Sequence, residues 1–114
     1  MTSPDIASAN VGPQGPLPGW GVPDSVSSVV TDTLTQMWMR GTLSPRDRKL
    51  VTIAVLVALG IHEPLRIHVH NGLNSGLSKD DIYELILQVG AYAGFARATD
   101  AYNITKEVLA AHQS

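Results

Sequence analysis

The fold of this chain is decided by the stretch SPRDRKLVTIAVLVALG, which spans residues 44–60. Ser44 suits a helix N-cap, and Pro45 suits the first helical position, where its missing N–H costs nothing. The stretch ends in a glycine, so it predicts a helix over residues 45–59. Residues 50–59 are apolar on nearly every side but cover only half of the ~20 residues that a membrane span needs. We therefore expect a core helix that is covered all round.

Four other segments show helical signals, of which the first two lie on either side of this core helix. Apolar residues recur at helical spacing from Asp24 or Ser25, either of which can cap the helix, to about Met39. Gly41 ends that pattern. A third helix is predicted from residue 63 to about residue 75, because a glycine suited to a helix C-terminus follows directly.

The last two predicted helices are separated by a pair of glycines. Ser78 and Asp81 match a capping box, which opens the fourth helix. Residues 90–94 contain two glycines, each of which weakens a helix by roughly 1 kcal/mol, so we expect a break or kink there. A fifth helix is predicted over residues 96–111. No segment alternates with period two, and the predicted fold class is therefore all-α, a single-domain bundle of about five helices.

Residues 1–23 differ in composition from the rest of the chain. They are rich in Pro, Gly, Ser and Asn, and predict a flexible arm ahead of a helical domain over residues 24–114. An alternative is that Leu17 and Trp20 drape over a neighbouring subunit. The arm lacks the basic cluster and apolar run of a secretory signal, and we expect a cytoplasmic protein.

Composition excludes several classes of function. The chain has 8 basic and 10 acidic residues and a formal net charge of -2, so no positive field attracts nucleic acid or a membrane surface. It contains no cysteine, which excludes disulfides, zinc–thiolate sites, iron–sulfur clusters and thiol peroxidase chemistry. We expect a small-molecule substrate and neither a nucleic-acid nor a membrane partner.

The amount of apolar surface predicts self-association. A domain of about 90 residues cannot by itself bury an all-apolar helix and two wide apolar stripes. We therefore expect residues 50–59 to contact other subunits, together with the outer face of the fourth helix at Tyr83, Leu87 and Tyr92. The prediction is a homo-oligomer.

Three of the four histidines, His62, His68 and His70, lie in or beside the third helix. Helical geometry places His68 on its apolar face, with Gly72 one turn later leaving space beside the imidazole, whereas His70 faces solvent. His68 is either a core histidine bonded to a neighbour or a general acid or base in a pocket. His68 and His70 point apart, and no carboxylate follows either at four-residue spacing, so we predict no metal site.

Arginine and aromatic residues are candidates for substrate binding. The two-pronged donor fork of arginine grips planar carboxylates, so arginines near a histidine suit a carboxylated substrate. Arg40 and Arg48 flank the core helix, while Arg46 is expected to be solvated or paired with Asp47, Asp80 or Asp100. The candidates for substrate binding are Trp38, Arg40, Arg48 and Tyr92.

Five motifs occur in a fixed order: MWMRGTL at 37–43, RKLVTIA at 48–54, LRIH at 65–68, LNSGLS at 73–78 and YAGF at 92–95. Together they closely resemble the carboxymuconolactone decarboxylase family, over roughly residues 36–110. The wider alkylhydroperoxidase-D-like superfamily includes members with a C-x-x-C and a following histidine. Those positions are Ile61, Pro64 and His68 here, which excludes dithiol peroxidase activity.

The resemblance implies a helical subunit that assembles into trimers or hexamers. It also implies decarboxylation of 4-carboxymuconolactone in aromatic catabolism, without a cofactor. His68, at least partly protonated, would deliver a proton to carbon, and Arg40 or Arg48 would stabilise the developing oxyanion. Many relatives carry an acidic residue at the position of Lys49, where a carboxylate could join a proton relay. Lys49 can instead bind an anionic substrate.

Three functions are compatible with this sequence. The first is a lyase or isomerase acting on a small carboxylated lactone or enolisable acid through His68. The second is a biosynthetic cyclase, dehydratase or isomerase that uses the same pocket. The third is a non-catalytic oligomeric binding module, because a fold alone does not determine an activity.

Overall fold

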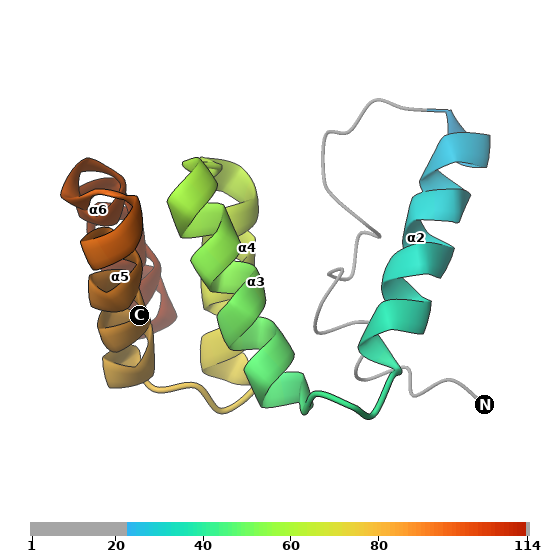
Figure 1. Cartoon of the computed structure of the whole chain (residues 1–114), viewed down its shortest axis with the longest axis horizontal. Coiled ribbons are helices and arrows are strands. Elements are labelled where there is room, and N and C mark those ends of the chain that lie inside the picture. The colour runs from blue at the N-terminus through green and yellow to red at the C-terminus, as the bar shows by residue number, and fades with distance from the viewer. Residues whose placement is uncertain (1–22, 114) are drawn as a thin grey trace. The chain divides into compact units, whose positions relative to one another are not determined.

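The computed structural model describes residues 23–113 and confirms an all-α fold, with no strand in that range. The predicted arm lies outside the described residues except for Pro23. The chain divides into two compact units, Met1–Pro45 and Arg46–Ser114. The helices are α2 (Asp24–Trp38), α3 (Pro45–Leu59), α4 (His62–Asn74), α5 (Lys79–Ala93) and α6 (Phe95–Gln113) (Figure 1).

Helix α2 in the first unit begins without the predicted side-chain cap. Its N-cap is Pro23, whose carbonyl accepts the N–H groups of Val26 and Ser27 at 3.0 Å each. Proline presets its own φ near the observed -58°, and the N-cap lies one residue before Asp24 and two before Ser25. Asp24 lies instead in the first turn, where a negative charge interacts favourably with the helix dipole.

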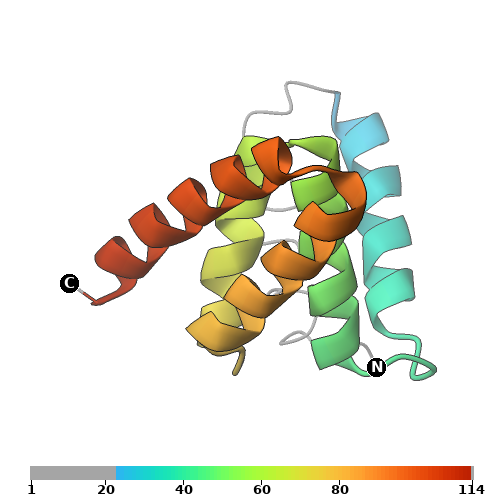
Figure 2. The same ribbon diagram turned by 60° about the vertical axis from the view of Figure 1, so that its left-hand side comes forward.

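Helices α3 to α6 in the second unit surround one apolar core. Helix α6 packs against both α4 and α5, and the core includes residues from all four helices (Figure 2). Burial of these branched side chains is the main favourable term that holds the unit together. The buried cluster consists of Ile53, Val57, Leu65, Val69, Leu77, Ile82, Ile86, Ala98, Ala101, Ile104 and Val108.

Helix α5 begins as predicted but continues further than expected. The Ser78 hydroxyl accepts the N–H of Asp81 at 3.0 Å and the carboxylate of Asp81 accepts the N–H of Ser78 at 2.9 Å, which confirms the capping box. The predicted break within residues 90–94 is confirmed at Gly94, whereas Gly90 is helical and buried against Phe95 and Ala98. Close packing outweighs its weak helix propensity, and the helix ends only at Gly94, whose φ is 112°.

Within one chain, helix α3 leaves one side exposed, and this is the helix whose residues 50–59 are expected to contact other subunits. Val51, Val55 and Leu59 are 54%, 48% and 59% exposed and follow one another at four-residue spacing. Leu87 is also exposed, but Tyr83 is half-buried and its ring lies 5.7 Å from that of Tyr102. None of the described helices combines the length and the apolar character needed to cross a membrane.

Candidate active site

The site is built where α3 and α4 approach each other at a glycine. Gly72 is buried, and a Cβ atom added to it would lie 3.5 Å from Cγ of Lys49 and 2.9 Å from a methyl carbon of Leu77. The space that the sequence predicts beside His68 is therefore filled by these two side chains rather than left open. Because residue 72 has no side chain, the stem of Lys49 can cross to α4 and reach His68.

Lys49 and His68 form a buried polar pair between the two helices. Lys49 Nζ lies 3.1 Å from His68 Nδ1, and the two residues are 3% and 9% exposed. Nothing in the local sequence spacing joins them, since they are 19 positions apart on different helices. The structure thus brings the predicted proton-transfer residue into contact with a residue predicted to bind an anionic substrate.

Burial sets the charge state of the pair. Desolvation, with a smaller contribution from the positive charge of Lys49, lowers the pKa of His68 from 6.5 to about 4. Desolvation also lowers the pKa of Lys49 from 10.5 to about 8. At pH 7 the imidazole is neutral and the lysine is mainly the ammonium form. The expectation of a partly protonated His68 is therefore wrong, and the acidic proton of the pair resides on Lys49.

The charge state also determines which ring nitrogen carries hydrogen. An ammonium has donors and no acceptor, so Nδ1 of His68 must accept from Lys49 with its lone pair. The imidazole proton is then on Nε2, the nitrogen that Lys49 does not contact. A neutral histidine in this tautomer presents an N–H donor at Nε2, while its Nδ1 accepts a hydrogen bond from the ammonium of Lys49.

The other predicted site residues are distributed over both units. Arg48 is half-buried in α3 directly before Lys49, and its carbonyl accepts the hydroxyl of Thr52 at 2.8 Å. Tyr92 is 86% exposed near the end of α5, and no described contact joins it to the Lys49–His68 pair. Trp38 ends α2, and Arg40 follows it as an exposed residue of the first unit. Among the predicted site residues, Lys49 and His68 are brought into direct contact.

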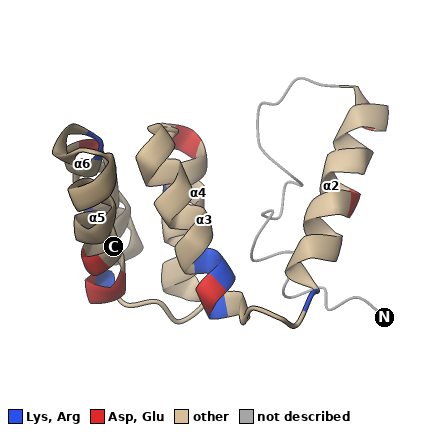
Figure 3. Ribbon diagram, viewed as in Figure 1, with Lys and Arg blue, Asp and Glu red and all other residues tan. Residues whose placement is uncertain are grey.

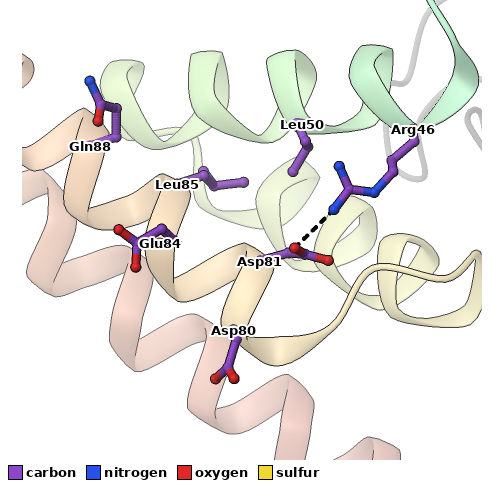
Figure 4. Close-up of a pocket in the computed structure, with 7 residues that line it drawn as sticks. All are labelled: Arg46, Leu50, Asp80, Asp81, Glu84, Leu85 and Gln88. Atoms are coloured by element: carbon purple, nitrogen blue, oxygen red, sulfur yellow. Dashed lines mark ion pairs between the residues drawn. The ribbon is translucent and has the colours of Figure 1, made fainter.

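Several charged residues of the second unit lie in the first turns of α3 and α5 (Figure 3). Arg46 forms an ion pair with the carboxylate of Asp81 at 2.9 Å, and Asp81 is not one of the three aspartates expected as its partner. The two residues point toward each other in a groove of about 510 Å³ (Figure 4). Neither Lys49 nor His68 lines this groove. Its lining residues are Arg46, Leu50, Asp80, Asp81, Glu84, Leu85 and Gln88.

His70 and Asn71 show how helix position separates polar residues of α4. His70 is exposed, and its Nε2 lies 3.1 Å from Nδ2 of Asn74, which confirms its predicted solvent-facing position. Nδ2 of Asn71 is instead buried and has no hydrogen-bond partner among the described residues. The sequence reasoning missed Asn71, although its place three residues after His68 on one helix was a usable signal. No cluster of three or more potential metal ligands occurs in residues 23–113.

Comparisons with known proteins find similarity to two decarboxylases. The chain is 42% identical over 73 residues to a 4-carboxymuconolactone decarboxylase from Acinetobacter baylyi, covering 64% of this chain and 54% of that protein. It is 23% identical over 73 residues to a nitrosuccinic acid decarboxylase from Metarhizium robertsii, covering 64% of this chain and 51% of that protein. The chain thus spans about half the length of these two relatives.

A sequence model of the carboxymuconolactone decarboxylase family matches residues 26–107, a range that includes both Lys49 and His68. This range covers most of the chain and includes all five motifs quoted above. The chain belongs to the carboxymuconolactone decarboxylase family.

Proposed function

We propose that this protein is a decarboxylase that removes CO2 from a small carboxylated lactone or a related enolisable acid, with His68 and Lys49 moving the proton. The observation that carries the proposal is the buried 3.1 Å contact between Lys49 Nζ and His68 Nδ1 in a chain of this family. Two relatives that are named as decarboxylases of different acids support the general reaction.

The reaction needs no external electron sink when the substrate is a conjugated lactone acid. The carbon–carboxylate bond breaks, CO2 leaves, and the electron pair enters the lactone as a dienolate. One proton then bonds to a carbon of this dienolate, which balances the loss of CO2. The protein has to hold the acid in a dry position, stabilise the developing enolate oxygen and supply that proton.

The Lys49–His68 pair can supply the proton as a relay. The Nε2–H of His68 gives its proton to carbon while Nδ1 takes one from the ammonium of Lys49. Lys49 is left as a neutral amine. The Nδ1 proton of His68 then returns to Lys49 while a proton from solvent binds Nε2, which restores both groups, so one proton is consumed for each CO2 released. The acid that feeds the relay is then Lys49, with a pKa of about 8, which is close to the working pH that favours general acid catalysis.

The remaining candidates would serve as substrate anchors. Arg48 adjoins Lys49 on α3, and its guanidinium is suited to a second carboxylate of the substrate. Arg40, Trp38 and Tyr92 are further candidates for substrate binding in the same proposal. Self-association through the exposed stripe Val51, Val55 and Leu59, into the trimers or hexamers that the resemblance implies, is also part of it.

Turnover of 4-carboxymuconolactone tests the proposal. Purified protein should consume the lactone faster than buffer does, as followed by NMR of substrate and product. His68→Gln keeps approximate size and polarity and should lower kcat/KM by about 10² to 10⁴, the usual range for general acid catalysis. Lys49→Met keeps the stem, removes the ammonium and should reduce kcat/KM by about 10² or more.

His70→Gln is the matched control, because it makes the same change two positions away on the exposed face of α4. It should retain the wild-type rate. A wild-type rate equal to that of buffer would reject the lactone as substrate, and turnover that His68→Gln leaves unchanged would remove His68 from the mechanism.

A further inference from the structure

The amide of Asn71 is a buried donor that the free protein does not use. Its Nδ2 is inaccessible to solvent and has no hydrogen-bond partner among the described residues. A buried polar group without a partner costs free energy, and most such groups in native proteins are satisfied. The packing of α4 therefore does not explain why residue 71 is an asparagine.

The position of Asn71 directs its amide toward the catalytic pair. Asn71 follows His68 by three residues within α4, so the two side chains are neighbours on the helix surface. Helical side chains lean toward the N-terminus, which carries the Asn71 amide toward the turn of His68. Because Nδ1 of His68 accepts from Lys49, the ring nitrogen that His68 can offer to a ligand is Nε2, and its N–H is also a donor.

Two donors on one side of a helix, beside a buried ammonium, suit an oxygen that gains negative charge. We propose that Asn71 is an oxyanion donor, whose amide N–H groups bind the substrate's carbonyl oxygen as it becomes an enolate. The inference rests on the proposed function and narrows its substrate class to acids whose departing carboxylate is conjugated with such a carbonyl. The amide is fixed before the reaction, so it stabilises the charge without reorganisation.

The substitution Asn71→Leu tests this role, because leucine has nearly the same shape and no donor. With 4-carboxymuconolactone, kcat should fall by about 10² to 10³ while KM changes little, as expected for an interaction made mainly in the transition state. The free variant should also melt higher, by about 4 °C, because it no longer buries an unpaired amide. A merely structural asparagine would not combine a gain in stability with a loss of kcat.

Asn74→Leu is the matched control. Asn74 follows Asn71 by three residues on α4, is exposed and contacts His70. It should keep wild-type kcat. Tetronate, the stable enolate of a lactone, gives a readout without turnover: calorimetry should show binding to wild type that Asn71→Leu weakens by about tenfold or more.

The outcomes separate this inference from the proposed function. Equal kcat or equal tetronate affinity in wild type and Asn71→Leu would overturn the role of Asn71 and leave the decarboxylase proposal standing. Absence of lactone turnover with Asn71-dependent tetronate binding would reject that substrate and support the oxyanion donor. Wild-type protein that neither turns over the lactone nor binds tetronate would overturn both.

Discussion

Nζ of Lys49 and Nδ1 of His68 lie 3.1 Å apart between two helices that meet at Gly72. Both side chains are deprived of water, so the fold disfavours the charged form of each. This relationship links the stability of the protein and its rate to pH, and the two dependences fall in different pH ranges.

Stability should fall as acid protonates His68. The pKa of His68 is lowered from 6.5 to about 4, so its contribution is fully present above pH 6.5 and is lost as pH falls through about 4. Between pH 7 and pH 4 the free energy of unfolding should drop by on the order of 3 kcal/mol more in wild type than in His68→Gln. Urea titrations across this range measure the difference, with His70→Gln expected to follow wild type. Parallel curves for wild type and His68→Gln would contradict the lowered pKa.

The rate should fall on the alkaline side as Lys49 loses its proton. If the ammonium feeds the relay, kcat/KM should decline above a pKa of about 8 and be level between this value and the acid limb set by His68. Lys49→Arg keeps a cation that does not deprotonate in this range, so its residual activity should lose the alkaline limb. Rate measurements from pH 5 to pH 10 decide this. An alkaline limb that persists in Lys49→Arg would assign it to another group.

Much of the fold could be predicted because local signals agreed with the tertiary structure. Pro45, the Ser78–Asp81 capping box and the glycines at 60 and 76 mark helix ends through their own backbone chemistry. The failures have tertiary causes. Gly90 stays helical because Phe95 and Ala98 pack against it, and this contact comes from the following helix.

The site could be predicted only in part. His68 stands out from helix periodicity and from the resemblance to a family, whereas its contact with Lys49 depends on how α3 and α4 cross. Its protonation state depends on burial, which a motif does not contain. Asn71 was missed because an asparagine in a helix is ordinarily exposed, and only the structure reveals its buried, unpartnered Nδ2.

Thr105 offers a test of the core. Its hydroxyl is fully buried in α6 and has no hydrogen-bond partner among residues 23–113. Thr105→Val replaces the hydroxyl with a methyl group of the same shape and should raise the free energy of unfolding by about 1 kcal/mol. Thr99→Val is the control, because the exposed Thr99 hydroxyl bonds the Phe95 carbonyl at 2.8 Å and should show no gain. Thermal unfolding measures both, and equal shifts would count against the unpaired hydroxyl.

Arg97 joins the beginning of α6 to the end of α3. Its guanidinium donates to the carbonyl of Leu59 at 2.7 Å, where a helix C-terminus leaves carbonyls without helical partners. Arg97→Ala should therefore lower the free energy of unfolding by about 1 kcal/mol, since the bond is charged but exposed. Lys106→Ala, at another exposed position of α6, should change it by less than half as much. Identical denaturation midpoints for the two variants would be the contrary result.

The exposed stripe of α3 predicts the state of assembly. Val51, Val55 and Leu59 would leave a continuous apolar surface in water if the protein were monomeric. Native mass spectrometry should give a multiple of the 12.2 kDa chain, and Val55→Lys should shift the protein toward smaller species. Gln88→Lys, which adds the same charge at an exposed position of α5, should leave the mass unchanged. A native mass of one chain would refute self-association.

The suppressed proton affinity of Lys49 and His68 also makes ligand capture a proton-coupled event. An anion that settles against the pair favours the charged form of both residues and so raises both pKa values. Near pH 8, where the free lysine is half protonated, binding should draw protons from the buffer. The heat of binding would then vary with the ionisation enthalpy of the buffer, and affinity would weaken as the solution becomes more alkaline. The same burial that keeps the histidine neutral thus makes the protein take up protons as it takes up its substrate.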